Sequence, residues 1–274
     1  MRQRGEVVIL CSTIDSASLN IGQCLQELGD WKDEGNFRSL GNRRLLFHDE
    51  EQTAQKGIEG RLKSLGLDPG LIIFPCRHKS KDKIPWLGGH FTGDAQKSRL
   101  ATAAPFALRS FLHSISVRIP EGFRYSAEAT HHGPIDVGVP SFFAEIGSSE
   151  AQWSDRGTGL AVARAIMDLD LVEMPVFLGF GGGHYVQRQT ELLFEAGIAF
   201  GHLFSSYQTG YLSLELVEQA KEKSGASYAY MDRKSLKSSD RTMVSKMLKD
   251  IGIELLKGKE IRATYPLKEK KVYP

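Results

Sequence analysis

Short apolar runs alternate with amphipathic stretches along most of this chain. The run Glu6–Cys11 predicts a buried strand, and Ser16–Leu28, ended by Gly29, predicts the helix that follows it. Another helix is expected after Ser154, its predicted N-cap, because apolar residues recur there at helical spacing. These residues are Val162, Ala165, Ile166 and Leu169.

The same alternation continues through the rest of the sequence. Strands are expected at Leu45–Phe47, Leu71–Phe74, Phe123–Ala129, Ser141–Ile146, Pro175–Phe180, Ile198–Phe204 and Ser227–Met231. Helices are expected at Pro105–His113, Val186–Glu195, Leu214–Lys223 and Ser239–Ile251. Pro75 is expected to stop the strand that precedes it. Because helices separate many of the strands, the pattern predicts an α/β fold, with a mixed, largely parallel sheet flanked by helices.

Composition is that of an ordinary globular protein. Hydrophobic residues make up 41% of the chain and charged residues 25%. The apolar stretches are far shorter than the roughly 18 residues of a transmembrane helix. The run Val7–Cys11 is also shorter than a signal-peptide core of roughly 7–15 residues. The three cysteines form no CxxC pair, which argues against a disulfide framework or a cysteine zinc site. We therefore expect a cytoplasmic protein with no membrane partner.

Positive charge gathers in two places, although the formal net charge is only +2. The first cluster consists of Arg77, Lys79, Lys81 and Lys83. The second cluster lies between Lys257 and Lys271. Such clusters can bind phosphates through charge and counterion release. They can equally be a solvated loop and a solvated tail, so charge alone does not identify a nucleic-acid-binding protein.

Several histidines lie beside glycine in segments that follow apolar runs. The segments are Leu87-Gly-Gly-His90, Thr130-His-His-Gly-Pro134, Gly181-Gly-Gly-His184 and Gly201-His202. Histidine titrates near neutrality and binds metals, and glycine lets ligands approach the backbone closely. The repeated combination indicates an active site assembled from loop segments.

The expected strands also suggest where this site lies. Titratable side chains stand at or just after their carboxyl ends, namely His78, His131, His132, Glu145, His184 and His202. In open α/β sheets, ligands bind in the crevice outside those ends. We therefore expect these side chains to converge, although they are far apart in the sequence.

The glycine-rich segment Gly179–His184 does not match a nucleotide-binding motif. The dinucleotide fingerprint requires glycine where His184 stands, and no GxxxxGK[ST] motif occurs in the chain. A strand–turn–helix junction with bare amides at Gly182 and Gly183 can instead stabilise an oxyanion or bind an anion. A tight structural turn is the alternative.

The paired imidazoles of His131 and His132 admit several roles. On an extended segment, adjacent side chains face opposite ways, so one ring is expected in the cleft and the other is expected to pack or hydrogen-bond elsewhere. Zinc prefers nitrogen from histidine and oxygen from carboxylates. Candidate ligands are a subset of His90, His131, His132, Glu145, His184 and His202, although no HExxH or HxH motif is present. Buried structural histidines are the alternative.

Glu145 and Cys76 each have two interpretations. Flanked by Phe142 and Phe143, Glu145 is either a general base whose pKa is raised by apolar surroundings or a structural partner of an arginine. Cys76 precedes Arg77, which can activate a thiolate, but an inert free thiol is the simpler interpretation. No GxSxG motif points to a catalytic serine.

Six blocks of the chain together resemble one family, the archaeal and plant type of D-aminoacyl-tRNA deacylase. The blocks are Arg77-His-Lys-Ser-Lys81, Leu87-Gly-Gly-His-Phe-Thr-Gly-Asp94, Ala129-Thr-His-His-Gly-Pro134, Phe142-Phe-Ala-Glu-Ile-Gly-Ser148, Gly179-Phe-Gly-Gly-Gly-His-Tyr185 and Gly201-His-Leu-Phe204. They follow the family's order along the chain. Gln187 departs from the proline expected there, at a helix start where proline is favoured but not required.

The resemblance implies an enzyme that hydrolyses the ester between a D-amino acid and tRNA and thereby removes mischarged tRNA. It implies dependence on zinc and a fold similar to that of peptidyl-tRNA hydrolases and nucleoside phosphorylases. We expect one α/β catalytic domain over residues 1–274, with a smaller basic subregion at about 235–274. We also expect a monomer that does not bind DNA.

The same resemblance suggests roles for the candidate residues. Histidine-bound zinc would activate a water, with Glu145 or a free imidazole such as His132 or His184 taking its proton. The amides of Gly182 and Gly183 would stabilise the oxyanion. The cluster of Arg77, Lys79, Lys81 and Lys83 would bind the tRNA backbone.

Two other functional classes fit parts of the sequence. A zinc hydrolase of small peptides or amides would use the same histidines without needing the basic clusters. A non-catalytic RNA-binding module would need the lysines but would leave the clustered histidines unexplained.

Overall fold

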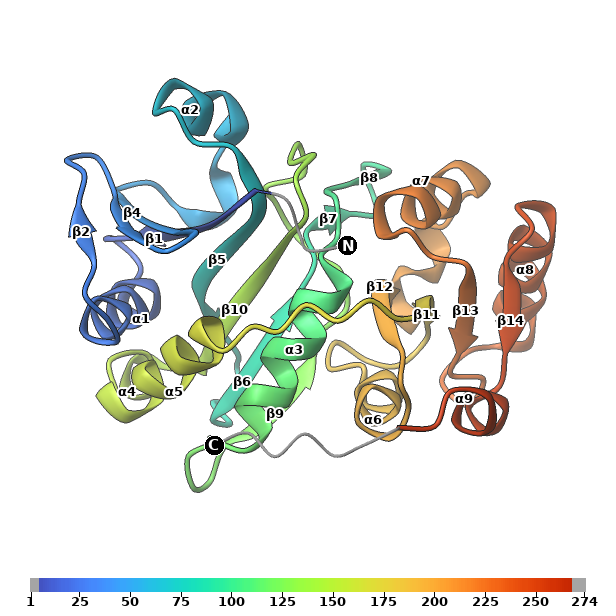
Figure 1. The fold of residues 1–274 in the computed structure, drawn as a ribbon. Helices are drawn as coiled ribbons and strands as arrows, with labels where there is room; N and C mark the ends of the chain where they lie inside the picture. Colours follow the sequence, from blue (N-terminus) through green and yellow to red (C-terminus); the bar gives the residue numbers. More distant parts are fainter. Residues whose placement is uncertain (1–4, 268–274) are drawn as a thin grey trace.

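Two main β-sheets organise the computed structural model, which describes residues 5–267 (Figure 1). The first sheet has the strand order β2 (Lys32–Asp33), β3 (Arg38–Leu40), β4 (Arg43–His48), β1 (Glu6–Ser12), β5 (Pro69–Lys79), β10 (Ser141–Ser148), β6 (Trp86–His90) and β9 (Arg124–Ala127). The second has the order β12 (Ala199–Phe204), β11 (Val176–Phe180), β13 (Tyr228–Met231) and β14 (Glu254–Leu256). A short ladder joins β7 (Gly93–Asp94) to β8 (Arg99–Leu100).

Most neighbouring strands run parallel. In the first sheet β4, β1, β5 and β10 are parallel, and all neighbours in the second sheet are parallel. The strands β6 and β9 are parallel to each other, but β6 is antiparallel to β10. The predicted α/β fold, with a mixed, largely parallel sheet flanked by helices, is confirmed. Similarity to peptidyl-tRNA hydrolases and nucleoside phosphorylases stays a prediction.

Helices cover both sheets and join them through one core. The helices are α1 (Ser16–Glu27), α2 (Ile58–Ser64), α3 (Pro105–Ser116), α4 (Glu150–Trp153), α5 (Arg156–Met167), α6 (Gln187–Glu195), α7 (Leu214–Ser224), α8 (Ser238–Asp250) and α9 (Gly258–Thr264), with 3-10 turns η1 (Gln52–Ala54) and η2 (Ser206–Tyr211). The helix α3 lies between the sheets and contacts β6, β9 and β12 (Figure 1). A single hydrophobic cluster includes Ile73 of β5, Phe111 of α3 and Phe177 of β11. The sheets therefore share a core, while the number of domains stays a prediction.

Two expected boundaries were wrong. Pro75 does not stop its strand, because β5 continues to Lys79. The ladder with β1 ends at Ile73, and beyond it the side-chain amide of Gln52 donates to the carbonyls of Leu10 and Pro75. A proline is tolerated in a strand where its missing N–H breaks no ladder.

The helix expected after Ser154 begins one residue later than that cap implies. Ser154 ends α4, and Asp155 caps α5 by accepting a hydrogen bond at 2.7 Å from the amide of Thr158. The strand β6 was not predicted from the sequence. Gly88 and Gly89 occupy two of its positions, and glycine has a low propensity for strands.

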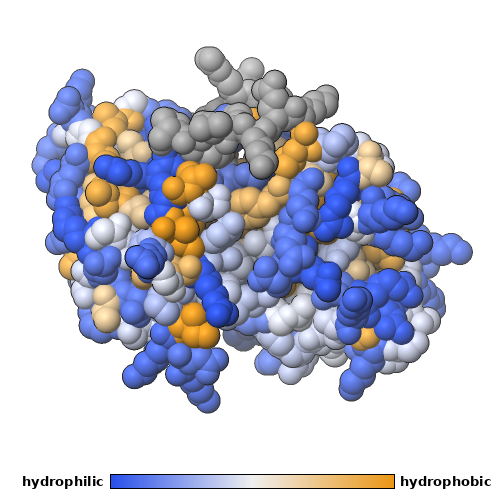
Figure 2. Space-filling model, turned by 90° about the horizontal axis from the view of Figure 1, so that it is seen from below, coloured by the Kyte–Doolittle hydropathy of each residue, from blue (hydrophilic) through white to orange (hydrophobic). Residues whose placement is uncertain are grey.

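The surface mixes polar and apolar residues. On the face shown in Figure 2, hydrophobic residues form small groups among hydrophilic ones. Among the described residues, none of the helices combines the length and the hydrophobicity that crossing a membrane would require.

Candidate active site

The site lies on the face of the first sheet where β5, β10, β6 and β9 are neighbours. Glu145, the fifth residue of β10, pairs with Cys76 on β5 and with Gly88 on β6. His90 pairs with Phe143, and His78 pairs with Gly147. Since side chains alternate along a strand, Glu145, His78 and His90 project from the same face. They converge partly because β6 runs antiparallel to β10, and not because all of them follow parallel strand ends.

Glu128, which sequence reasoning did not single out, lies in the centre of this face. It follows β9, is fully buried, and forms an isolated bridge with Tyr185. A Cβ atom on Gly88 would lie 2.8 Å from its Oε1 atom, so the glycine leaves room for the carboxylate. An acid inside an otherwise mostly apolar expected strand, three residues before a histidine pair, was the available signal.

The turn that carries His131 and His132 connects the two sheets. The amide of Thr130 donates to the carbonyl of Leu203 on β12, and the amide of Gly93 donates to the carbonyl of His132. His132 has φ = 41°, in the left-handed region that non-glycine residues rarely adopt. The segment is therefore not extended. The two rings lie 4.3 Å apart, and both contact His90, so the expectation that only one would face the cleft was wrong.

Three imidazoles are held in the same tautomer by main-chain carbonyls. The Nδ1 atoms of His90, His131 and His132 donate to the carbonyls of Phe91, Ala129 and Gly133, at 3.0, 2.8 and 2.8 Å. This leaves each Nε2 atom as the nitrogen that can accept a proton or bind a metal. The three residues can each offer one ligand atom within 4.8 Å of the others. The backbone thus prepares a group of three nitrogen ligands.

Among the described residues, Glu145 pairs with histidines and not with an arginine. Its Oε2 atom lies 3.2 Å from Nδ1 of His78, and its Oε1 atom lies 3.4 Å from Nε2 of His90. Burial by itself raises the pKa of Glu145, but the charge of His90 and the hydrogen bond with His78 hold it well below its usual range. The raised pKa expected for a general base in apolar surroundings was therefore wrong.

The histidines around Glu145 divide into two electrostatic classes. Burial lowers the pKa of His78, but Glu145 and Glu128 outweigh it and raise that pKa to about 9. The pKa of His90 is raised for the same reason, since Glu145 and Glu128 outweigh its burial. Burial and the neighbouring charge of His90 lower the pKa of His131 well below its usual range and that of His132 to about 4. The turn therefore presents the neutral imidazoles of His131 and His132 at pH 7.

His184 faces the buried acid that the sequence did not identify. Its Nε2 atom lies 2.9 Å from Oε2 of Glu128, without the alignment of a hydrogen bond, and its Nδ1 atom lies 3.4 Å from the hydroxyl of Tyr207. The main chain holds this pairing, since the amide of Ala129 donates to the carbonyl of His184 at 2.9 Å. The atoms of His78, Glu128 and His184 form a second group close enough to hold one ion.

His202 does not join these groups. It lies inside β12, where Nε2 donates to the carbonyl of Ala101 at 3.0 Å and Nδ1 contacts the hydroxyl of Thr130 at 3.1 Å. Burial lowers its pKa to about 3. Both ring nitrogens are used within the fold, so neither is left for a metal, and the structure places His202 among the structural residues.

The glycine turn offers fewer amides than the sequence suggested. The amide of Gly181 donates to the carbonyl of Phe204, and that of Gly182 donates to the hydroxyl of Ser235 at 2.6 Å. An amide that already donates within the fold is a poor oxyanion donor, which removes Gly182 from that role. Gly183 is exposed, with open space where a side chain would be. It remains the candidate donor of this turn.

Cys76 is a buried thiol. Its Sγ atom contacts Oδ2 of Asp15 at 3.5 Å, and burial raises its pKa well above the usual value. The thiolate interpretation is therefore excluded, since nucleophilic cysteines need a lowered pKa.

The first basic cluster borders the histidines. A cavity of about 560 Å³ is lined by Arg77, Lys79 and Lys81 together with His78, His131, His132, Glu145 and His184. We call it the basic cavity. Arg77 is partly neutralised by Asp15 and Glu51, at 3.8 and 3.7 Å, whereas Lys79, Lys81 and Lys83 are exposed. In the second cluster, Lys257 and Arg262 pair with Glu260 and Glu195, and Lys268, Lys270 and Lys271 lie outside the described residues.

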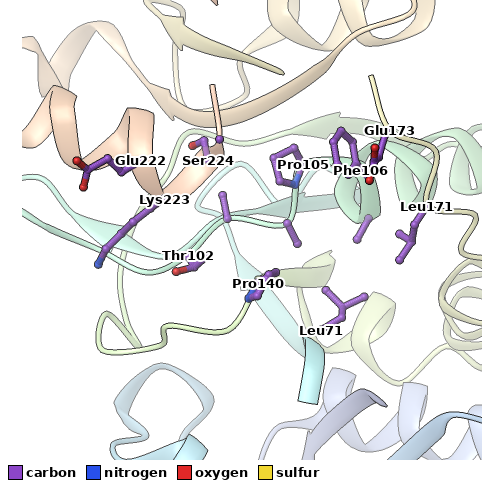
Figure 3. Close-up of a pocket in the computed structure, with 14 residues that line it drawn as sticks. Leu71, Thr102, Pro105, Phe106, Pro140, Leu171, Glu173, Glu222, Lys223 and Ser224 are labelled. Carbon is purple, nitrogen blue, oxygen red and sulfur yellow. The ribbon is translucent and has the colours of Figure 1, made fainter. Parts of the chain in front are cut away.

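Another cavity, of about 430 Å³, lies away from the histidines (Figure 3). Leu71, Pro105, Phe106 and Pro140 line it, and Lys223, from the end of α7, donates its ammonium hydrogen to the carbonyl of Leu100. None of the residues that line it is a histidine or a cysteine. The basic cavity is therefore the candidate active site.

Comparison with known proteins supports the family suggested by the sequence blocks. The family model for D-aminoacyl-tRNA deacylase matches residues 65–256. Curated proteins named D-aminoacyl-tRNA deacylase are 46% identical in Methanothrix thermoacetophila, over 94% of this chain and 99% of that protein, and 42% identical in Methanosarcina barkeri, over 95% and 92%. A crystal structure titled as a conserved protein of unknown function is 30% identical, with a TM-score of 0.89 over 97% of this chain and 99% of that one.

The family match covers Glu145, the His131–His132 turn and His184, the same residues that the fold assembles around one cavity. With this match and these relatives, the chain belongs to the D-aminoacyl-tRNA deacylase family.

Proposed function

We propose that this protein hydrolyses the ester bond between a D-amino acid and tRNA, releasing both. Family membership supports the reaction, and the observation that carries it is the convergence of His90, His131, His132 and His184 with two buried carboxylates beside exposed lysines. A hydrolase of small peptides would not need the lysines, and an RNA-binding module would not need the imidazoles. Neither alternative is favoured by the family.

The donor set fits a zinc ion. The Nε2 atom of His90 and both carboxylate oxygens of Glu128 are buried and make no well-aligned hydrogen bond, although Glu145 lies 3.4 Å from the former and His184 2.9 Å from Oε2 of the latter. Buried polar atoms in this state are suited to binding an ion. His90, His131 and His132 would hold the ion through Nε2, because their Nδ1 atoms are already committed to carbonyls. When bound, zinc lowers the pKa of a water molecule and polarises an ester carbonyl.

Residues of the chain itself would handle the proton. Glu128 faces Nε2 of His184 and favours a proton on that nitrogen, which leaves Nδ1 to accept one from water. Glu145 holds the imidazoles of His78 and His90 in place by charge, and is a positioning residue in this scheme. The exposed amide of Gly183 lies on the same turn as His184, where it can stabilise negative charge on the ester oxygen.

The lysines beside the cavity would hold the nucleic acid. Lys79 and Lys81 line the basic cavity and Lys83 follows in the same exposed segment, with no acid paired to them among the described residues. A tRNA backbone that passes over them would place its 3′ end at the histidines, with binding that weakens as salt rises.

Chirality tests the reaction. Purified protein should release tyrosine from D-tyrosyl-tRNA much faster than from L-tyrosyl-tRNA, measured as acid-soluble amino acid over time. Equal release from both substrates, or release from neither with zinc present, would contradict the proposed function.

Metal content tests zinc separately from activity. Elemental analysis and calorimetric titration of chelator-treated protein should show zinc binding, and His131→Asn with His132→Asn should weaken it. If zinc binds equally well to this double variant, another group of residues holds the ion.

A further inference from the structure

A further cavity borders the His131–His132 turn. Its volume is about 290 Å³, compared with about 560 Å³ for the basic cavity, and both histidines line both cavities. We call it the tyrosine cavity. It is also lined by Gly93, Asp94, Ala95, Gln96, Tyr207, Gln208 and Tyr211. The imidazoles of His131 and His132 therefore border two cavities of unequal size.

The two cavities differ in charge. Arg77, Lys79 and Lys81 outnumber Glu145 among the charged residues that line the basic cavity, whereas Asp94 is the charged residue lining the tyrosine cavity. The Oδ2 atom of Asp94 lies 2.8 Å from Nζ of Lys97, and hydrogen bonding with Lys97 lowers the pKa of Asp94. Asp94 is thus ionised at neutral pH. Lys97 is 71% exposed, so this pair is screened by solvent.

Two tyrosines stay open to solvent beside the site. Tyr207 is 56% exposed and Tyr211 is 46% exposed, although large apolar rings are normally covered. Both belong to η2, which Ser205 and Gln208 close with a capping box. The side-chain amide of Gln208 donates to the carbonyl of Thr130 at 2.8 Å, so η2, which carries both rings, is anchored to the histidine turn. A pre-organised aromatic wall binds a flat or apolar group at low entropic cost.

We propose that the tyrosine cavity binds the amino-acid part of the substrate, while the basic cavity receives the ribose–phosphate end. The assignment rests on the proposed function and adds where each arm of the ester lies. An aminoacyl-tRNA ester has a long polyanionic arm and a short arm with an α-ammonium group. Charge attraction places the polyanionic arm beside Lys79 and Lys81 and the α-ammonium group beside Asp94. The smaller volume also suits the shorter arm.

Side-chain preference tests the role of the tyrosines. Tyr211→Ala should lower kcat/KM for D-tyrosyl-tRNA by roughly 10-fold, the scale of a lost aromatic contact. With D-alanyl-tRNA, whose methyl group does not reach the ring, the change should stay within about 2-fold. Tyr211→Phe should restore the preference. Leu214→Ala, at a residue 41% exposed outside the cavity, is the matched control.

Equal losses of Tyr211→Ala on D-tyrosyl-tRNA and D-alanyl-tRNA would mean that the cavity holds ribose or nucleobase, and would overturn the assignment. Unchanged rates on both would also overturn it. Circular dichroism of each variant guards against a folding effect. If the wild-type protein hydrolyses neither D-substrate, the proposed function itself fails, which is a different result.

The α-ammonium group gives an independent measurement. Asp94→Asn should lower kcat/KM for D-tyrosyl-tRNA several-fold, as expected of a partly exposed charge pair. N-acetyl-D-tyrosyl-tRNA carries no charge there and should be hydrolysed equally by the wild type and the variant. The same loss on both substrates would show that Asp94 does not face the ammonium group.

Discussion

Two of the segments that pair histidine with glycine have completely different surroundings. At Gly201-His202 the imidazole lies inside β12, with both nitrogens within 3.1 Å of groups of the fold and a pKa lowered to about 3. At His131-His132-Gly133 each ring gives only Nδ1 to the backbone and contacts the ring of His90.

The difference shows which property separates a structural histidine from a functional one. Burial does not, since His90 and His202 are both fully buried. The two histidines differ in whether one ring nitrogen is left without a hydrogen bond to the rest of the fold and is therefore available to a ligand. A buried nitrogen without a partner costs stability, so the fold gains nothing by keeping it unless it binds something.

The largest expected effect is on turnover at the histidine turn. His131→Asn and His132→Asn should each lower kcat for D-tyrosyl-tRNA by roughly 10²-fold or more, the scale of a lost ligand or acid–base group. Circular dichroism should be unchanged. If either variant keeps wild-type turnover, the replaced histidine has a structural role, as His202 does.

Replacing the buried acid should have the next largest effect. Glu128→Gln removes the charge facing His184 and His78 and should lower kcat by roughly 10- to 100-fold, as for residues that orient ligands or bases. Glu121→Gln, at an exposed position, is the matched control. Equal kcat values for the two variants would show that Glu128 serves only to fill space beside Gly88.

A smaller effect is expected at the lysines. Lys79→Ala with Lys81→Ala should raise KM for D-tyrosyl-tRNA several-fold, keep kcat, and reduce the salt slope by up to about 0.9 per lost phosphate contact. Lys32→Ala with Lys246→Ala, both exposed elsewhere, is the control pair. An unchanged salt slope would place the tRNA at another surface.

The smallest effect on turnover is expected at His202. His202→Asn should keep kcat within about 3-fold, because His202 belongs to none of the three groups of possible metal ligands among the described residues. Stability should respond instead. A pKa lowered from about 6.5 to about 3 gives stability that is complete above pH 6.5 and is lost as pH falls toward 3.

Urea unfolding at pH 7.5 and pH 5 measures this contribution. The wild-type free energy of unfolding should fall between these values by about 2 kcal/mol more than that of His202→Asn. An identical pH dependence, or a large loss of turnover in the variant, would remove His202 from the structural class.

Much of the fold could be predicted from the sequence. Local patterns suffice for β1, α1, α3, β10, β11, α6, β12 and α8, since each has a periodicity of its own. The boundaries at Pro75 and Ser154 could not be predicted from the sequence. The side chain of Gln52 bonds to the carbonyl of Pro75 within its strand, and the side chain of Asp155, in place of Ser154, caps the helix. The strand β6 was missed because Gly88 and Gly89 weaken its pattern, and only the fold shows that a side chain at Gly88 would meet Glu128 and one at Gly89 would meet Leu108.

The sequence by itself determined the family, the α/β class and the candidate residues, because blocks of consecutive residues carry that information. Tertiary structure decided which candidates meet. It brought His90 to Glu145 through an antiparallel strand, added Glu128, and satisfied both nitrogens of His202. The physical reason is that a hydrogen bond or ion pair depends on atoms distant in the chain, so a residue's role follows from the partners that the fold supplies.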